Sequence, residues 1–377
     1  MTDGFADILI RWYADNHRRL PWRETSDPYL IWLSEVILQQ TRVAQGLDYF
    51  RRFVARFPDV RSLAEAPQDE VLKLWQGLGY YSRARSLHTA AKDIMARFGG
   101  RFPEDYEAVR SLCGVGDYTA AAICSFAYEL PYAAVDGNVY RVLSRVYDVD
   151  LPVDDAAGKR YFAELAQSLL DPVRPGLQNQ ATMEFGALQC VPQRPDCGAC
   201  PLADRCLAQA HGTVGRRPVK RGKAAVRPRY FNYLCIRCDG TLLLRQRTEK
   251  DIWRNLYEFP LIETDAETEF DALQRTSAWK AWFGGERRMR IGERTAMPRH
   301  VLSHRIIYAC FQEIELERIP DSLSGFLRVP EAELDRYAVS RLTERYLERR
   351  RAAGVNVKVG KPVSYTHLRA HETRHDL

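Results

Sequence analysis

Two carboxylates in the first part of the chain have the surroundings that acid–base chemistry at a sugar requires. Glu35 lies in PYLIWLSEVILQQTRVAQ, residues 28–45, where Ile31 and Trp32 are one helical turn away. Apolar neighbours desolvate a carboxyl group, which raises its pKa from about 4.3 towards neutrality and lets it act as a general acid. Asp136 lies in an Asp-Gly-Asn turn before a predicted helix. Cleavage at an anomeric carbon needs such an acid together with a second carboxylate.

Each of these carboxylates also fits an ordinary structural role. Glu35 could form a salt bridge at the edge of its helix, and Asp136 could be the N-cap of the helix that follows it. Other motifs in the chain are needed to distinguish these structural roles from catalysis.

The segment LCGVGDYTA, residues 112–120, joins two predicted helices through a Gly-Val-Gly turn. The second of these helices is predicted from about Tyr118 to Tyr128. No strand precedes the glycines, which argues against a dinucleotide-binding fold. Gly114 and Gly116 can take positive φ and leave backbone N–H groups open at the start of a helix, which suits a phosphate. A helix corner with glycine as its C-cap is the alternative.

Four cysteines are close together in CVPQRPDCGACPLADRC with the spacing C-x6-C-x2-C-x5-C; they are Cys190, Cys197, Cys200 and Cys206. Four thiolates on a short loop can hold either a [4Fe–4S] cluster or a tetrahedral zinc ion. We interpret the array as an iron–sulfur site, although the ligand type alone does not exclude zinc. By contrast, Cys235 and Cys238 lie three apart in a strand-like segment, so they face opposite ways and we expect no site there.

Composition and pattern predict two domains. Residues 1–210 are almost wholly helical in pattern, and 211–229 form a basic linker that either follows DNA or stays solvated. Residues 230–353 contain strand-like runs and indicate an α+β domain. From about Val363 the pattern is lost, so we expect 354–377 to be a disordered or non-native tail.

The net charge of +6 among 377 residues suits a polyanionic partner. No apolar run reaches the length of a membrane span, and the N-terminus lacks the order of a signal peptide. We therefore expect a cytoplasmic protein without membrane contact.

Taken together, the motifs resemble those of the MutY-type adenine DNA glycosylases of the helix-hairpin-helix superfamily. The matching segments are LPWRETSDPYLIWLSEVILQQT, GLGYYSRAR, LCGVGDYTA, VDGNV and the four-cysteine array. The resemblance covers residues from about 8 to 350, with the strongest motifs before 206. It implies a mainly α helix-hairpin-helix glycosylase domain with a [4Fe–4S] loop, followed by a smaller α+β NUDIX-like domain.

The resemblance also implies the activity. The expected reaction is base-excision repair, in which adenine opposite 8-oxoguanine or guanine in double-stranded DNA is flipped out and its N-glycosidic bond is hydrolysed. The expected enzyme is a monomer in a bacterial cytoplasm, associated with the nucleoid.

Catalytic roles follow by matching position. Glu35 would protonate the adenine at N7, and Asp136 would stabilise or capture the sugar cation, while Asn138 and Tyr118 would support them through hydrogen bonds. In the endonuclease III branch a lysine stands at the position of Tyr118, where it attacks the sugar and forms a Schiff base. A phenol cannot form that imine, so the resemblance implies a monofunctional glycosylase.

Further residues would contact the DNA. The pocket for the extruded base would be lined by Trp22, Arg23 and Gln180. The residues that fill the base stack and address the oxidised guanine would be Gln40, Thr41 and Tyr80, with Ser303 and His304 of LSHRI reading 8-oxoguanine. Gly114 and Gly116 would bind a phosphate.

Two departures from the family pattern and three rival functions remain. Cys113 stands where the hairpin usually has proline. A NUDIX hydrolase box might begin at YEFPLIE, but the glycines and the REUxEE carboxylates that would hold Mg²⁺ are missing. We therefore expect the second domain to recognise the lesion. The rivals are a thymine or uracil glycosylase, which has no use for an N7 acid such as Glu35, a non-enzymatic DNA-binding protein and a NUDIX hydrolase.

Overall fold

The described residues of a computed structural model, which are 4–222, 226–284 and 288–352, form two compact units. The first unit comprises described residues of 1–66 and 82–223, and the second comprises those of 67–81 and 224–377. The expected tail at 354–377 lies outside the described residues. The helical pattern places 67–81 in the helical domain, whereas the structure groups this segment with the second unit.

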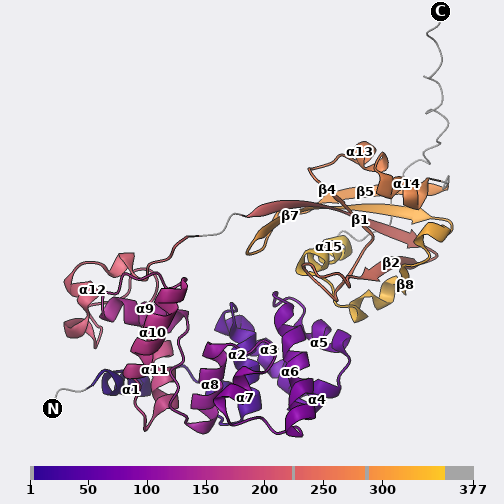
Figure 1. Ribbon diagram of the computed structural model, residues 1–377. Coiled ribbons are helices and arrows are strands. Elements are labelled where there is room, and N and C mark those ends of the chain that lie inside the picture. The colour runs from indigo at the N-terminus through magenta and orange to yellow at the C-terminus, as the bar shows by residue number, and fades with distance from the viewer. Residues whose placement is uncertain (1–3, 223–225, 285–287, 353–377) are drawn as a thin grey trace, which may run out of the picture. The chain divides into compact units, whose positions relative to one another are not determined.

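The first unit is helical (Figure 1). Its helices are α1 (Phe5–Asn16), α2 (Pro28–Leu38), α3 (Val43–Arg56), α4 (Val60–Glu65), α6 (Ser82–Phe98), α7 (Tyr106–Arg110), α8 (Asp117–Tyr128), α9 (Gly137–Val146), α10 (Ala156–Ser168), α11 (Pro175–Leu188) and α12 (Leu207–Ala210). Short 3₁₀ turns span Pro21–Arg23, Ala203–Arg205 and Val214–Arg216. Across the described residues of the chain, no helix combines the length and the apolar character that crossing a membrane requires.

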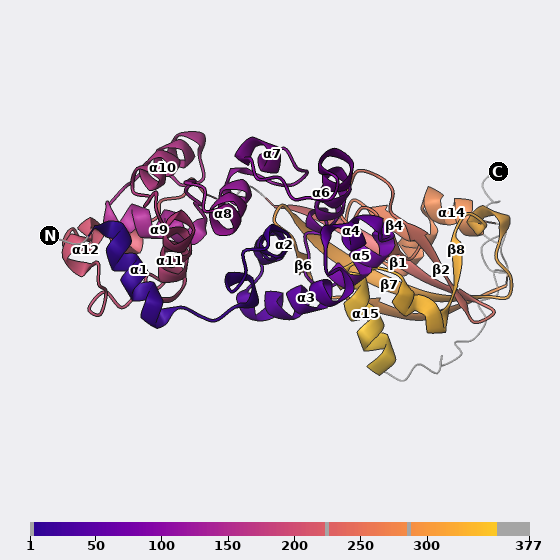
Figure 2. The same cartoon turned by 90° about the horizontal axis from the view of Figure 1, so that it is seen from below.

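Two groups of helices make up this unit. Helix α1 packs against α11, although most of the helical domain separates the two in sequence (Figure 2). Helix α11 also packs against α9, and α9 packs against α10 and α12. Leu9, Val142, Phe185 and Leu202 are buried together in the core of this group. Helices α2, α3, α4, α6, α7 and α8 form the other group, in which α2 packs against α8. Because α11 also packs against α8, the two groups are joined along that contact.

The predicted hairpin is formed by α7, α8 and the turn between them. Gly114 has φ of +80°, and a Cβ at this position would lie 2.6 Å from the Cβ of Ser86, so both backbone angle and space require glycine. We expected that Gly116 could also take a positive φ, but its φ is −100° and it is the N-cap of α8. A Cβ on Gly116 would meet no described atom within 4 Å, so neither strain nor packing demands glycine there.

The second unit is built on a mixed sheet with the order β3-β2-β1-β7-β5, in which β1 and β7 are parallel. Its strands are β1 (Arg227–Cys238), β2 (Thr241–Gln246), β3 (Tyr257–Glu258), β4 (Leu261–Thr264), β5 (Met289–Ala296), β6 (His300–Val301), β7 (Arg305–Leu316) and β8 (Leu327–Pro330). Strand β4 pairs with β1, β6 with β7, and β8 with β2. Its helices are α5 (Gln68–Trp75), α13 (Phe270–Gln274), α14 (Ser277–Phe283) and α15 (Arg341–Ala352), with 3₁₀ turns at Asp321–Leu323 and Glu331–Arg336.

Helices cover both faces of this sheet, with α13 and α14 on one face and α15 on the other (Figure 1). Alternate side chains of β1 therefore enter two different cores. Cys235 belongs to the core that contains Tyr346 of α15, whereas Cys238 belongs to the core that contains Trp279 of α14. The expectation that these two cysteines face opposite ways is confirmed.

The segment 67–81 belongs to the second unit because its polar side chains hydrogen-bond to that unit. The Asp69 carboxylate accepts hydrogen bonds from the Tyr257 hydroxyl at 2.8 Å and from the Gln246 amide at 3.1 Å. The Gln76 amide donates to Glu344 at 2.8 Å. These contacts join residues that are far apart in sequence. Helical periodicity is a local pattern, so it cannot predict them.

We predict that Gly186→Ala lowers stability by about 1–3 kcal/mol, the usual cost of overpacking. A Cβ at this position on α11 would lie 2.6 Å from the Cβ of Asn138 and 2.9 Å from its carbonyl oxygen, so α9 would have to shift. Urea unfolding followed by circular dichroism measures the change. The matched control is Gly215→Ala, where a Cβ would meet no described atom within 4 Å. Equal stability of both variants and the parent would contradict this close packing.

Candidate active site

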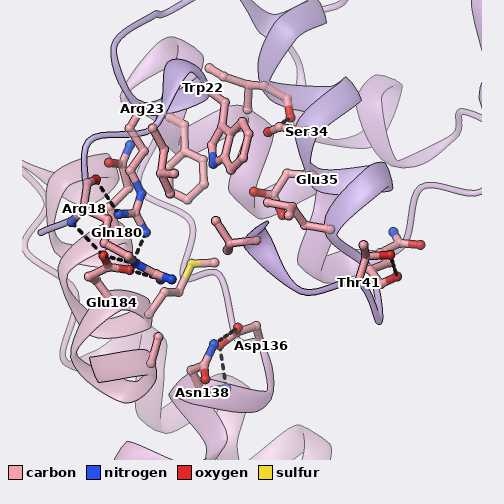
Figure 3. A pocket seen from close by; sticks show the side chains of 18 of the residues that line it. Arg18, Trp22, Arg23, Ser34, Glu35, Thr41, Asp136, Asn138, Gln180 and Glu184 are labelled. Atoms are coloured by element: carbon pink, nitrogen blue, oxygen red, sulfur yellow. Dashed lines mark hydrogen bonds and ion pairs between the residues drawn. The ribbon is translucent and has the colours of Figure 1, made fainter. Parts of the chain in front are cut away.

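A pocket of about 320 Å³ lies between the two helix groups of the first unit (Figure 3). Nine of the residues singled out from the sequence line it: Trp22, Arg23, Glu35, Gln40, Thr41, Tyr118, Asp136, Asn138 and Gln180. Helices α2 and α8 contribute one wall, and the start of α9 together with α11 contributes the other. The segment before α2, which includes Trp22 and Arg23, also lines the pocket, so five separate parts of the sequence meet at one cavity.

Glu35 is held in the pocket by a helix that is buried along most of its length. Helix α2 begins at Pro28 after its N-cap Asp27, whose carboxylate accepts a hydrogen bond from the backbone N–H of Tyr29. The Glu35 side chain is 7% exposed, and the Tyr118 hydroxyl donates to its Oε2 at 2.6 Å. Burial raises the pKa of Glu35 to about 7, although the hydrogen bond from Tyr118 opposes the shift. A carboxyl group with this pKa can hold and release a proton near neutral pH.

The end of α2 is fixed by a cation from another motif. Arg83 belongs to GLGYYSRAR, and its guanidinium group donates to the carbonyl oxygens of Val36 at 2.9 Å and Ile37 at 3.0 Å. Such capping satisfies carbonyl groups that the ending helix leaves without partners. The chain then turns through Gln40, which has φ of +57°, and this turn brings Gln40 and Thr41 to the rim of the pocket.

Asp136 faces the pocket as the N-cap of α9. Its Oδ1 accepts hydrogen bonds from the backbone N–H groups of Asn138 and Val139, both at 2.8 Å, and its Oδ2 accepts one from the Asn138 amide at 2.7 Å. Burial raises its pKa above the ordinary value, while these hydrogen bonds favour the charged form. The capping role and the pocket position thus coexist in one residue. Its charge also contributes to the raised pKa of Glu35.

An acidic residue that sequence analysis missed closes the opposite wall. Glu184 of α11 is fully buried, and its carboxylate accepts hydrogen bonds from Arg18 at 2.6 Å and from Arg23 at 2.7 Å. Burial alone would raise the pKa of Glu184, but the two guanidinium groups hold it well below its usual range. The signal available in the sequence was a glutamate in the apolar helical segment ATMEFGAL. The sequence does not show that Arg18 and Arg23 are its partners, so Glu184 could not be distinguished from an ordinary glutamate at the edge of a helix.

Gln180, one turn before Glu184, is oriented by a second residue that the sequence did not point to. The hydroxyl group of buried Tyr13 on α1 donates to Gln180 Oε1 at 2.9 Å. This hydrogen bond uses the amide oxygen of Gln180, whose NH₂ group can act as a donor. Trp22 is also buried, and it packs edge-on against Phe50, with ring centroids 5.2 Å apart.

Other residues expected at the site lie elsewhere. Tyr80, Ser303 and His304 are exposed and belong to the second unit, where the Tyr80 and Ser303 hydroxyl groups are 2.8 Å apart. Gly114 and Gly116 are in the hairpin turn and do not line the pocket.

The four array cysteines line one cavity, together with Arg145 at the end of α9. The Arg145 guanidinium group donates to Cys190 Sγ at 3.4 Å, and the Cys206 thiol donates to the backbone carbonyl oxygen of Arg145 at 3.4 Å. A buried cation beside the sulfur atoms fits a group held by thiolates, since their negative charge would otherwise be uncompensated. Among the described residues, no three His, Cys, Asp or Glu side chains converge on a position for a single metal ion.

The same helix connects the cysteine loop to the pocket. Arg141, one turn before Arg145, donates to the carbonyl oxygen of Cys190 at 2.8 Å and to Asn138 Oδ1 at 2.8 Å. The loop that carries the thiols therefore supports the start of α9, where Asp136 and Asn138 lie.

Three family models match the chain. Residues 33–167 match the HhH-GPD superfamily of base excision DNA repair proteins, and residues 190–206 match the iron–sulfur binding domain of endonuclease III. Residues 232–349 match the NUDIX domain. These matches confirm the expected helix-hairpin-helix fold, the iron–sulfur cofactor and the NUDIX-like second domain.

Similar proteins agree with these matches. The adenine DNA glycosylase of Buchnera aphidicola from Acyrthosiphon pisum is 33% identical over 264 residues, which are 70% of this chain and 75% of that protein. The human adenine DNA glycosylase is 42% identical over 215 residues, which are 55% of this chain and 39% of that protein. A solved structure of a thermostable thymine-DNA glycosylase has a TM-score of 0.51 and 27% identity, covering 55% of this chain and 95% of its own.

The relatives that match over most of their length share the adenine activity, and the pocket carries a buried acid facing a second carboxylate. The chain therefore belongs to the adenine DNA glycosylase family of base-excision repair enzymes.

Proposed function

We propose that this enzyme excises adenine paired with 8-oxoguanine or guanine in double-stranded DNA and hydrolyses only the N-glycosidic bond. The observation that supports it most is the Glu35 carboxyl group, which has a pKa of about 7 and lies in one pocket with Asp136. A base inside a duplex cannot reach such a pocket, so the adenine must be extruded first. Gln180, Trp22 and Arg23 line the space that would receive it.

The chemistry divides between the two carboxyl groups. Glu35 donates its proton to N7 of the adenine, and the bonding electrons between C1′ and N9 move into the departing base. The Asp136 carboxyl group, held by three hydrogen bonds, stabilises the oxocarbenium-like sugar until water adds to C1′ and loses a proton to solvent. The Tyr118 hydroxyl keeps the Glu35 carboxyl group oriented.

Tyr118 also bears on whether the strand is cut. Strand cleavage by a glycosylase requires an amine that attacks the sugar and forms an imine. Tyr118 offers a phenol whose pKa is raised well above its usual value by burial, and its proton is directed to Glu35. Among the described residues that line the pocket there is no lysine. We therefore infer a monofunctional glycosylase.

DNA contacts outside the pocket would come from the hairpin and the cysteine loop. The turn at Gly114 and the open space at Gly116 allow a phosphate to approach the start of α8, where the helix dipole favours an anion. The iron–sulfur cluster, held by the four array cysteines, would brace the adjoining loop as a structural element.

The second unit would read the base opposite the adenine. Tyr80 and Ser303 form a hydroxyl pair on its surface, with His304 next in the chain, and such groups can stack on and hydrogen-bond to a base. Glu258 lies in YEFPLIE, where a NUDIX hydrolase box might begin. Its carboxylate already forms ion pairs with Arg247 at 2.7 Å and Arg245 at 3.0 Å. Such a carboxylate is poorly suited to bind Mg²⁺, which supports recognition rather than hydrolysis.

Glu35→Gln should lower the single-turnover rate of adenine excision at least a hundredfold, because the amide cannot donate the proton that the leaving base needs. The measurement uses an end-labelled duplex with adenine opposite 8-oxoguanine, guanine or thymine, treated with alkali to reveal abasic sites. The parent should act fastest opposite 8-oxoguanine. Glu65→Gln, which alters an exposed helix glutamate, is the control and should match the parent. Unchanged excision in Glu35→Gln would rule out the acid role.

The parent protein should leave intact strands when alkali is omitted, and sodium borohydride should trap no protein–DNA adduct. Tyr118→Lys puts an amine at the same position in the pocket and should yield a trapped adduct. Electrophoresis under denaturing conditions measures both products. Efficient trapping in the parent would mean that a lysine elsewhere performs lyase chemistry.

The buried carboxyl group should also make stability depend on pH. The pKa of Glu35 is raised by folding from about 4.5 to about 7, so its contribution to stability is complete below pH 4.5 and is lost as pH rises through 7. Relative to Glu35→Gln, the parent should lose about 2–3 kcal/mol of unfolding free energy between pH 5 and pH 8. Urea unfolding at several pH values measures it. Asp15→Asn, at an exposed carboxylate, should show no such difference from the parent.

A further inference from the structure

A second cavity, which we call the back cavity, adjoins the active-site pocket. Its volume is about 430 Å³, within the usual range of small-molecule sites. The residues that line both cavities are Arg18, Leu20, Arg23, Phe126 and Gln180. His17, Arg19 and Ser26 also line the back cavity and are exposed, so it opens to solvent.

Side chains separate the two cavities. Gln180 is held by the hydroxyl group of Tyr13, while Arg23 donates to Glu184 and to the carbonyl oxygen of Arg18 at 3.1 Å. Figure 3 shows Arg23, Gln180 and Glu184 gathered on the side of the pocket away from Thr41. Side chains change rotamer much faster than domains or helices move, so a passage here needs no change of fold.

The reaction creates a need for such a passage. An extruded nucleotide stays attached to DNA on both sides, so the DNA occupies the mouth through which the base entered. After bond cleavage the abasic strand still occupies that mouth, and the free base lies deeper in the pocket. A base that leaves before the DNA must use another opening.

We propose that the back cavity is the exit path and transient binding site of the excised purine base. This inference rests on the extrusion and excision of adenine proposed above. A purine is flat and uncharged, with donor and acceptor groups along its edges. The back cavity offers matching partners in the Gln180 amide, the guanidinium group of Arg19 and the hydroxyl groups of Thr25 and Ser26.

The test separates release of the base from cleavage. Ser26→Trp and His17→Trp each add bulk at an exposed residue that lines only the back cavity. Asp15→Trp changes an exposed residue that lines neither cavity and is the matched control. Enzyme in excess is mixed with a duplex carrying one radiolabelled adenine opposite 8-oxoguanine. Alkali-cleaved strand gives the cleavage rate, and rapid filtration of the protein–DNA complex gives the rate at which free adenine appears.

In the parent, free adenine should appear while the DNA is still bound. Ser26→Trp and His17→Trp should keep the cleavage rate within twofold and slow the appearance of free adenine at least fivefold, whereas Asp15→Trp should change neither rate. Release of adenine at the parent rate in both tryptophan variants would overturn the inference, as would release in the parent only together with the DNA. Absence of any cleavage by the parent would instead refute the proposed function itself.

Discussion

The burial of one carboxyl group, that of Glu35, is the constraint on which the site depends. A glutamate that is 7% exposed stays protonated near neutral pH only if surrounding groups satisfy it without neutralising it. The Tyr118 hydroxyl does this by donating one hydrogen bond, and Arg83 secures the end of the helix that carries the acid. Glu35 is buried on a helix, α2, that packs against α8, and α8 in turn packs against α11 of the other helix group. The surroundings of the acid therefore depend on contacts both within and between the two helix groups.

A second buried glutamate, Glu184, lies at the opposite wall of the pocket and differs from Glu35 in its hydrogen-bond partners. Glu184 is buried as well, but two guanidinium groups keep it ionised, whereas Glu35 has a phenol as its direct hydrogen-bond partner. Two buried glutamates in one pocket therefore have pKa values on opposite sides of the ordinary range. This separation supports the proposed role of Glu35 as the proton donor, while Glu184 accepts hydrogen bonds from Arg18 and Arg23 and holds them in place. The same ion pairs form part of the partition in front of the back cavity.

Helix α9 links the two distinctive features of the first unit. Its N-cap Asp136 and its first-turn residue Asn138 line the pocket. Further along the helix, Arg141 and Arg145 hydrogen-bond to the cysteine loop. The loop of the iron–sulfur cluster is thereby connected to the active-site pocket through the side chains of α9. The second unit carries its own exposed hydroxyl pair, Tyr80 and Ser303, and Tyr80 reaches that unit because the segment 67–81 hydrogen-bonds to its sheet and to α15.

The sequence by itself determined the character of the two domains, the two pocket carboxylates and the cysteine array, because short motifs record local geometry directly. Helical periodicity around Glu35, an Asp-Gly-Asn cap at Asp136 and four spaced cysteines each have a local meaning. Only the tertiary structure decided what depends on distant partners: the ion pairs of Glu184, the orientation of Gln180 by Tyr13, and the grouping of 67–81 with the second unit. The φ of Gly116 was also decided there, because a glycine in a turn is free to take either sign of φ until the flanking helices pack. Contacts between residues more than a hundred positions apart leave no periodic signal in a single sequence, and that is why these features could not be predicted from it.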